Sequence, residues 1–350
     1  MAEQLRRPVS GGIGTYVRGL VQGLTGMEGE SAPDVTLYAS RPPRGGPDPL
    51  AALGPPLATS VLPAPVLVRA WDRGIGRLPG HPDVVHATSF ATPPAGDVPL
   101  SMMVHDLAWR HFPDAYPERG RRWHEAALGR AVEGAALLIV PSATVADDLL
   151  AAGAPPARVE VVEEGCDHLA EPDDEGAAAL LGRLGVTGDF LLTVSTLEPR
   201  KNLPSLLAAY EQARHRLREP WPLVVVGPAG WGPSLRPRPG VVLAGQATGG
   251  VLSALYGRAR LVAYVPLREG FGLPVVEAMA CGAPVVASAV PSAGGAALEV
   301  DPSDVAGIAA GLVEAALDDG RRTELVAAGR ARAAGLTWAA AARRHVELWA

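Results

Sequence analysis

Along the chain, short apolar runs alternate with longer segments in which apolar residues recur at helical spacing. This alternation is typical of βαβ units, which build parallel sheets covered by helices. In the first half of the chain, the predicted strands are Val35–Tyr38, Asp83–His86, Leu100–His105, Leu137–Val140 and Val159–Val162. The predicted helices are Pro117–Glu133 and Ser142–Ala152, and Ser142 is the expected N-cap of the second.

The second half repeats the same alternation. Its predicted strands are Phe190–Ser195, Leu223–Val226, Val241–Leu243, Leu261–Val265, Pro284–Ala287 and Ala297–Val300. Its predicted helices are Asn202–Arg216, Val251–Ala259, Pro274–Cys281, Ser303–Ala316, Arg321–Ala334 and Trp338–Trp349. The polar, acidic stretch 165–176 contains Pro172 and reads as a linker, so we expect a first domain over residues 1–168 and a second from residue 169.

The start of the chain departs from a regular doubly wound domain. Only ten residues precede Gly11, and Arg6, Arg7 and Pro8 interrupt them. The first strand of the N-terminal domain is therefore expected to be missing or reduced to a stub. Open α/β sheets bind ligands at the carboxyl ends of their strands, so functional residues are expected on the loops that follow strands.

Composition narrows the possible functions. A net charge of −6 argues against nucleic-acid binding through bulk electrostatics. The two cysteines, Cys166 and Cys281, lie far apart without nearby ligand spacing, which favours neither a disulfide framework nor a zinc site and fits a reducing cytoplasm. No window approaches the roughly 18 continuous apolar residues of a membrane span, so we expect a soluble protein with at most peripheral membrane contact.

The densest chemical signal is the segment 268–282, REGFGLPVVEAMACG. It reads as a loop followed by a short helix, with Pro274 at the first helical position and Gly282 just past the end. Gly270 and Gly272 would let the backbone approach an anion at the helix N-terminus. Glu269 and Glu277 would face one cavity and accept hydrogen bonds from sugar hydroxyls. In the alternative interpretation, Glu277 only complements the helix dipole and Glu269 is a solvated loop residue.

A second signal follows the strand Phe190–Ser195. In the segment TLEPRKNL, Arg200 and Lys201 stand at a strand-to-helix turn that Asn202 could cap. An adjacent arginine and lysine can clamp a diphosphate, although such a pair alone is often a solvated turn.

Two weaker signals lie in the first half. Ser10–Val17 contains a glycine cluster that opens a helix and could hold a phosphate or an acceptor group. His105 lies at the end of a predicted strand, where it could contact a reacting sugar with Asp106 orienting it, or be a satisfied structural histidine.

Together these residues resemble glycosyltransferase family 4, specifically its mannosyltransferase-like group. The matching segments are GGIGTY, HATSF, VHDLAWRHFP, VPSATVADDL, EPRKN, VVGPAGWG and LYGRARLVAYVPLREGFGLPVVEAMACGAPVVAS. The resemblance implies the GT-B fold, with two Rossmann-like domains facing a central cleft and a final helix, 337–350, that crosses back to the first domain. It further implies a bacterial, cytoplasmic enzyme of polysaccharide biosynthesis, at most peripheral at the inner face of the membrane.

The resemblance also assigns roles by matched position. In the second domain, Arg200 and Lys201 would hold the diphosphate and Glu277 the ribose. The transferred hexose would contact Glu269 and the backbone of Gly270, Phe271 and Gly272. From the first domain, His105 would face the donor sugar, while the turn at Gly12 and Gly14 would close on the phosphates or the acceptor.

The implied reaction transfers a hexose with retention of configuration from a GDP- or UDP-linked donor. Mannose from GDP-mannose is one candidate. The acceptor would be a glycan, a lipid-linked sugar or a small molecule. The two cations would stabilise the departing nucleoside diphosphate without a metal.

Some positions depart from the family pattern. Several residues, including a glutamate, appear deleted after Ser288, and Glu163 or Glu164 stands where the family has a proline. With the reduced first strand, these departures leave a second interpretation open, a catalytically impaired homologue that binds a nucleotide or serves as a partner subunit. A third, an NAD-dependent oxidoreductase, depends on the motif GGIG alone and lacks the strand before it.

Overall fold

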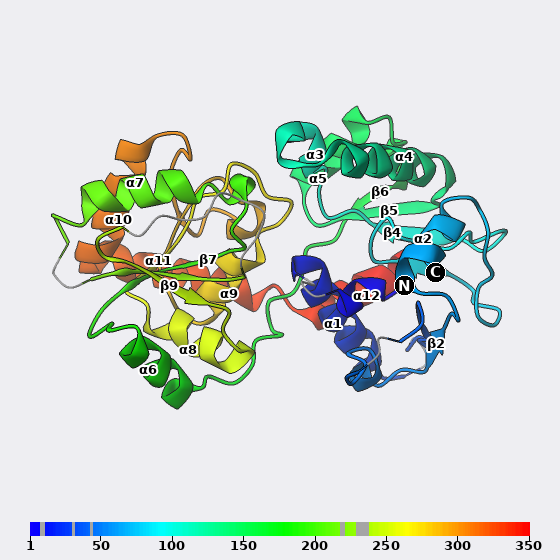
Figure 1. Cartoon of the computed structure of the whole chain (residues 1–350), viewed down its shortest axis with the longest axis horizontal. Coiled ribbons are helices and arrows are strands. Elements are labelled where there is room, and N and C mark those ends of the chain that lie inside the picture. Colours follow the sequence, from blue (N-terminus) through cyan, green and yellow to red (C-terminus); the bar gives the residue numbers. More distant parts are fainter. Residues whose placement is uncertain (8–10, 30–31, 43–44, 218–220, 229–237) are drawn as a thin grey trace. The chain divides into compact units, whose positions relative to one another are not determined.

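The computed structural model describes residues 1–7, 11–29, 32–42, 45–217, 221–228 and 238–350. The chain divides into two compact units (Figure 1). Unit 1 comprises Met1–His168 and Thr337–Ala350, and unit 2 comprises Leu169–Leu336. Ser10 and part of the segment VVGPAGWG, both singled out in the sequence, lie outside the described residues.

Unit 1 holds a four-stranded parallel sheet, in the order β3-β4-β5-β6, and a two-stranded parallel sheet of β1 and β2. The strands are β1 (Leu37–Ala39), β2 (Leu57–Thr59), β3 (Val85–Ala87), β4 (Leu100–Met103), β5 (Leu137–Val140) and β6 (Val159–Val161). The helices are α1 (Gly11–Thr25), α2 (Ala64–Trp71), α3 (Ala108–His111), α4 (Glu118–Gly134), α5 (Ala143–Ala151) and α12 (Trp338–Trp349).

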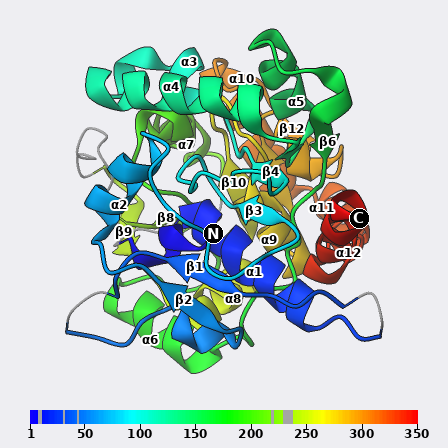
Figure 2. The same cartoon turned by 90° about the vertical axis from the view of Figure 1, so that its right-hand side faces the viewer.

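Side chains that alternate along the strands give the larger sheet two apolar faces. Met102 and Leu138 pack with α4 and α5 on one face. Met103 and Ile139, their chain neighbours, pack with α1 and α12 on the other. Figures 1 and 2 show the two helix pairs on opposite sides of the strands.

A reduced first strand is expected ahead of α1. Among the described residues, no strand precedes α1, and Glu3–Arg6 form a 3₁₀ turn. The backbone of Ala2 donates to the Tyr38 carbonyl at 3.1 Å, and the Met1 amino group donates to the His86 carbonyl at 2.8 Å. These two residues therefore contact β1 and β3, the neighbours that a full strand would join.

Two glycines of α1 explain how α12 packs so closely on it. A Cβ at Gly19 would lie 2.0 Å from the Trp338 ring, and one at Gly23 would lie 2.3 Å from the Trp338 carbonyl. Such distances exclude any larger side chain without movement of the helices. The last helix of the chain is thus part of the core of unit 1.

Unit 2 holds a six-stranded parallel sheet in the order β12-β11-β10-β7-β8-β9. The strands are β7 (Leu191–Val194), β8 (Leu223–Val226), β9 (Val241–Gly245), β10 (Leu261–Tyr264), β11 (Val285–Ala287) and β12 (Leu298–Glu299). The helices are α6 (Asp174–Arg183), α7 (Leu203–Ala213), α8 (Gly249–Arg258), α9 (Leu273–Ala280), α10 (Val305–Leu317) and α11 (Asp319–Ala334). Helices α7 and α10 share one apolar core with the strands, and Figure 1 shows α8 on the opposite face.

The strand order of unit 2 has a topological switch point between β7 and β10. The chain builds outward from β7 through β8 to β9, and β10 then returns to the other side of β7. The connections that follow β7 and β10 therefore diverge to opposite faces and leave a crevice at the carboxyl ends, the usual ligand site in such sheets.

The apolar pattern missed short or polar elements. It did not predict β2, α2, α3 or α6. β2 is only three residues long and lacks a buried side chain, while the acidic start of α6 was assigned to the linker 165–176. Asp173 in fact caps α6, since its side chain accepts from Gly176 N. None of the described helices is long and apolar enough to span a bilayer.

Candidate functional site

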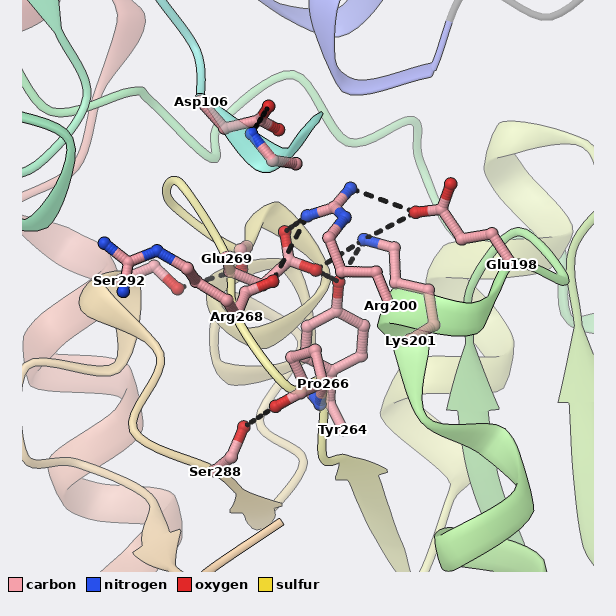
Figure 3. Close-up of polar contacts among 12 residues, drawn as sticks. Asp106, Glu198, Arg200, Lys201, Tyr264, Pro266, Arg268, Glu269, Ser288 and Ser292 are labelled. Carbon is pink, nitrogen blue, oxygen red and sulfur yellow. Dashed lines mark hydrogen bonds and ion pairs between the residues drawn. The ribbon is translucent and has the colours of Figure 1, made fainter. Parts of the chain in front are cut away.

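Two loops meet at the switch point of unit 2. After β7, the chain runs through a 3₁₀ turn, Pro199–Lys201, into α7, and after β10 residues 265–272 lead into α9. Because β7 and β10 are paired, both loops leave the same edge of the sheet, and Leu267 N donates to the Arg200 carbonyl at 2.9 Å. Figure 3 shows charged side chains of the two loops pointing toward one another.

These side chains form a charged cluster, defined here as Glu198, Arg200, Lys201, Tyr264 and Glu269. Lys201 Nζ lies 2.6 Å from Glu269 Oε1, and Arg200 donates to Glu269 Oε2 at 3.0 Å. The other arm of the Arg200 guanidinium donates to Glu198 Oε1 at 3.0 Å. The structure thus brings together three predicted site residues and adds two that the sequence analysis did not select.

The cluster is close to neutral as a whole. It holds two cations and two carboxylates, and Arg200 and Lys201 are only 14% and 13% exposed. The sequence predicted a basic pair free to clamp an anion. In the structure, an anionic ligand would compete with the carboxylates of Glu198 and Glu269 for the N–H groups of the two cations.

Opposing effects set the pKa of Glu269. Burial raises this pKa, but Arg200 and Lys201 more than offset it, and hydrogen bonds from Lys201 and Tyr264 lower it further, to about 2. Burial and the nearby Glu269 carboxylate raise the pKa of Tyr264 well above its usual value. Glu269 is therefore ionised and Tyr264 neutral at physiological pH.

Asn202 holds the first loop in place in a way the sequence did not predict. It has a left-handed backbone with φ of 55°, and its side chain does not cap α7. Instead, Asn202 Nδ2 donates to the Val265 and Pro302 carbonyls at 3.1 and 2.8 Å. The amide thereby fixes the turn that carries Arg200 and Lys201 against the loop after β10.

The glycine loop before α9 is equally constrained. Gly272 has φ of 100°, and a Cβ there would lie 2.1 Å from Val290 Cγ1, so glycine is required. Ser292 donates from its backbone N to the Phe271 carbonyl at 3.0 Å and from its hydroxyl to the Gly272 carbonyl at 2.8 Å. Gly270 lies buried in this loop.

The ends of α9 match the sequence analysis in part. Leu273, not Pro274, is the first helical residue, and Pro274 is the second. Gly282, with φ of 80°, lies just past the end of the helix as predicted.

Glu277 lies on α9 and is 8% exposed. Tyr256 of α8 donates a hydrogen bond to Glu277 Oε2 at 2.9 Å. Tyr256 is fully buried, and burial together with Glu277 raises the pKa of this phenol well above its usual value. The two glutamates thus have different partners: Glu269 contacts two cations and Tyr264, and Glu277 contacts Tyr256.

In unit 1, the glycine cluster is helical. Gly12 and Gly14 lie in the first turn of α1, which begins at Gly11, rather than in a turn ahead of it. Gly12 is exposed and Gly14 is buried. The backbone at Gly12 is therefore accessible at a helix N-terminus.

His105 lies just beyond β4, and both ring nitrogens have partners in unit 1. Nε2 contacts the Thr88 carbonyl at 3.1 Å, and Nδ1 contacts Glu164 Oε1 at 3.2 Å. Asp106, the residue expected to orient His105, instead accepts a hydrogen bond from Ala108 N at the start of α3 through its carboxylate. Glu164, noted in the sequence only as a departure from the family pattern, is the carboxylate that contacts this histidine.

A chain of neutral polar groups lies beside His105. The phenol of Tyr16 is 2.8 Å from His86 Nε2 and 2.8 Å from His345 Nε2. His345 Nδ1 donates to the Ala341 carbonyl, so its Nε2 accepts from Tyr16, whose oxygen in turn accepts from His86. With His105 and Glu164, these residues form what we call the histidine cluster: Tyr16, His86, His105, Glu164 and His345.

Signals for the residues that the sequence analysis missed were weak. Glu198 and Tyr264 flank recognised motifs, but a lone glutamate and a strand-end tyrosine are common in any α/β protein. Tyr256 stands in an apolar helical run that reads as core packing. Tyr264 and Tyr256 are identified by their contacts with Lys201 and Glu277, which lie on other elements, and Glu198 by its contact with Arg200, two positions along the chain.

Comparisons with known proteins agree with this architecture. Residues 10–168 match the family described as Glycosyltransferase Family 4, and residues 188–318 match Glycosyl transferases group 1. O-antigen chain mannosyltransferase B of Escherichia coli is 31% identical over 251 residues, which cover 67% of this chain and 65% of that protein. D-inositol 3-phosphate glycosyltransferase 1 of Catenulispora acidiphila is 31% identical over 332 residues, covering 85% of this chain and 78% of that protein.

Solved structures share the fold. The crystal structure of Anabaena HepE in complex with UDP and glucose has a TM-score of 0.71 at 19% identity, over 98% of this chain and 97% of that one. Sucrose-phosphate synthase from Thermosynechococcus elongatus has a TM-score of 0.68 at 20% identity, over 99% and 96%. The fold is that of GT-B glycosyltransferases, and the chain belongs to glycosyltransferase family 4. It spans just under two thirds of the length of the E. coli mannosyltransferase.

Proposed function

We propose that this protein is a retaining glycosyltransferase that moves a hexose from a nucleoside-diphosphate sugar to a glycan, lipid-linked or small-molecule acceptor. The observation that carries the proposal is the charged cluster at the switch point of unit 2, where Arg200 and Lys201 meet Glu269. The mannosyltransferases among its relatives make GDP-mannose the first donor to test, and the UDP complex of HepE makes UDP-glucose the second.

In this proposal, the charged cluster binds the diphosphate and the hexose. Arg200 and Lys201 would hold the diphosphate, with the backbone of Gly270, Phe271 and Gly272 close to the donor. Glu269, whose low pKa keeps it an acceptor, would receive hydrogen bonds from hydroxyls of the hexose. When the bond between the anomeric carbon and the diphosphate breaks, negative charge grows on the leaving group, and the two cations stabilise it.

Other residues have proposed roles in the same reaction. Glu277 would accept hydrogen bonds from the ribose, in an orientation that Tyr256 fixes. His105 would contact the donor sugar, which requires one ring nitrogen to exchange a present partner for the ligand. Gly12 at the start of α1 would approach a phosphate or acceptor group, and Gly14 would allow close packing beside it. We propose a metal-independent reaction in the cytoplasm.

A panel of donors tests the proposal. A thermal-shift series with UDP-, GDP- and ADP-sugars should single out one nucleotide, since a ligand at 100 times its Kd adds about 2.7 kcal/mol of stability. The selected donor is then incubated with simple sugar and alcohol acceptors. Release of the nucleoside diphosphate and an unchanged anomeric configuration, read by NMR, are the expected results. If no nucleotide stabilises the protein and none is released, the proposal is wrong.

A further inference from the structure

Tyr264 occupies the centre of the charged cluster. It is the last residue of β10 and only 2% exposed. Its hydroxyl donates to Glu269 Oε1 at 2.9 Å and accepts from Lys201 Nζ at 2.8 Å. Since Lys201 Nζ also contacts Glu269 Oε1 at 2.6 Å, the three polar atoms form a closed triangle (Figure 3).

The three side chains differ in rigidity. A lysine ammonium sits on a flexible four-carbon chain, and Glu269 projects from a loop. A tyrosine has two χ angles, and Tyr264 is anchored in a central strand of the sheet. The fixed partner in the triangle is therefore the phenol, and the ammonium and the carboxylate take their positions from it.

We propose that Tyr264 is a positioning residue for the Lys201–Glu269 pair, and that its buried hydroxyl sets where the ammonium meets the departing diphosphate and where the carboxylate meets the hexose. This inference rests on the proposed function for the identity of the ligands. The triangle itself consists of contacts within the protein and does not depend on that identity.

Tyr256 offers a matched control. It is also a fully buried tyrosine whose hydroxyl donates to a glutamate, Glu277, but that glutamate is assigned to the ribose. Tyr264→Phe and Tyr256→Phe each remove one buried hydroxyl and keep the ring. A merely structural role for both hydroxyls predicts similar behaviour in the two variants.

The test measures turnover as release of GDP from GDP-mannose or of UDP from UDP-glucose, and affinity by calorimetric titration with GDP and UDP. Tyr264→Phe should lower turnover by about 10- to 100-fold, the loss typical of a hydrogen bond to a charged group. Its turnover should fall more than its nucleotide affinity, because the contacts of Glu269 with the hexose act on the transition state. Tyr256→Phe should instead lose more nucleotide affinity than turnover, with Kd and KM raised by a similar factor.

Two measurements could overturn the inference. One is the kinetic comparison, if the turnover of Tyr264→Phe lies within about twofold of the wild type or if both variants show the same split between turnover and affinity. The other is a ligand-free crystal structure of Tyr264→Phe in which Lys201 and Glu269 keep their present positions. This second measurement does not require a donor, so it tests Tyr264 even if the wild type neither binds nor releases any nucleotide, a result that would defeat the proposed function instead.

Discussion

The charged cluster of unit 2 and the histidine cluster of unit 1 differ in how they stabilise buried polar side chains. Each gathers polar side chains most of whose atoms are removed from water. In the charged cluster, full charges compensate one another, and the pKa of Glu269 falls to about 2. In the histidine cluster, burial lowers the pKa of His86 well below its usual value and that of His345 to about 4, so that both rings are neutral.

This difference suits the two clusters to different roles, one in ligand binding and one in structure. Paired charges can exchange partners, since an incoming diphosphate can replace a carboxylate beside Arg200 or Lys201 without leaving a cation unpaired. The chain from His345 through Tyr16 to His86 instead joins α12, α1 and β3 by directional hydrogen bonds. We infer that the charged cluster serves ligand binding and that this chain of neutral groups serves to hold the last helix in unit 1.

The largest expected effect comes from breaking the charged cluster. Lys201→Ala should lower turnover by about 10²- to 10³-fold, the usual loss when one group that stabilises transition-state charge is removed. Affinity for the nucleoside diphosphate should fall by about 1.5–3 kcal/mol. Steady-state kinetics and calorimetric titration measure the two quantities.

Arg238→Ala is the matched control for this change. It breaks the exposed pair with Glu211 in the same unit and should change neither quantity, because exposed pairs contribute little. Equal affinities of the wild type and Lys201→Ala for the bound nucleotide would defeat the assignment of this lysine.

The next largest expected effect is a difference between the two clusters in how pH changes the stability of the fold. The pKa of His345 is lowered in the folded protein, so as pH falls this histidine binds a proton in the unfolded chain before it does in the folded protein. The stability that the neutral imidazole contributes is therefore fully present above pH 6.5 and is lost as pH falls toward 4. The loss for this group alone is about 3 kcal/mol. Glu269 also has a lowered pKa, but its contribution is lost only between pH 4.5 and about 2. Unfolding in urea at a series of pH values should therefore show the histidine loss first.

His345→Gln isolates this contribution. The variant should lose stability less steeply than the wild type between pH 6.5 and 4.5, because the buried imidazole no longer titrates on unfolding. His81→Gln removes an exposed histidine from the same unit and serves as the matched control. Identical slopes for the wild type and His345→Gln would show that His345 does not contribute to the loss of stability in acid.

A third prediction compares the two glutamates. Glu277→Gln should weaken donor and free nucleoside diphosphate by a similar factor of about 10 or more, since the ribose is present in both. Glu269→Gln should reduce turnover much more than affinity for the free nucleotide. Nucleotide affinity, turnover and melting temperature are measured for both variants. Losses of melting temperature alone, equal in both, would support the purely structural interpretation of helix-dipole complementation.

The sequence predicted the parallel α/β organisation because it depends on local apolar periodicity. The strand β8, which is fully buried, and β5, which is buried except at Leu137, have the bounds that their apolar runs indicated. β2 was missed because three half-exposed residues carry no periodic signal. In the charged cluster, Arg200, Lys201 and Glu269 could be selected by motif, but the pairing of Glu269 with the two cations could not, since it depends on how β7 and β10 align. The contact of Glu198 with Arg200, two positions along the chain, depends on the geometry of the 3₁₀ turn that follows Glu198. Glu164 shows the same limit, because it reaches His105 across 59 positions of the chain.

The smallest expected effect concerns divalent metal. Arg200 and Lys201 already place two positive charges where the diphosphate would bind, and no Asp-Xaa-Asp-like pair follows a strand in the described part of unit 2. Turnover should therefore survive excess EDTA unchanged, with nucleotide release as the assay. Lys201→Ala gives a more sensitive form of the experiment. If a metal and this lysine both stabilised the charge on the diphosphate, turnover of the variant, unlike that of the wild type, would depend strongly on added manganese. Loss of wild-type turnover in EDTA and its recovery with manganese would show that the two cations do not suffice to stabilise the departing diphosphate.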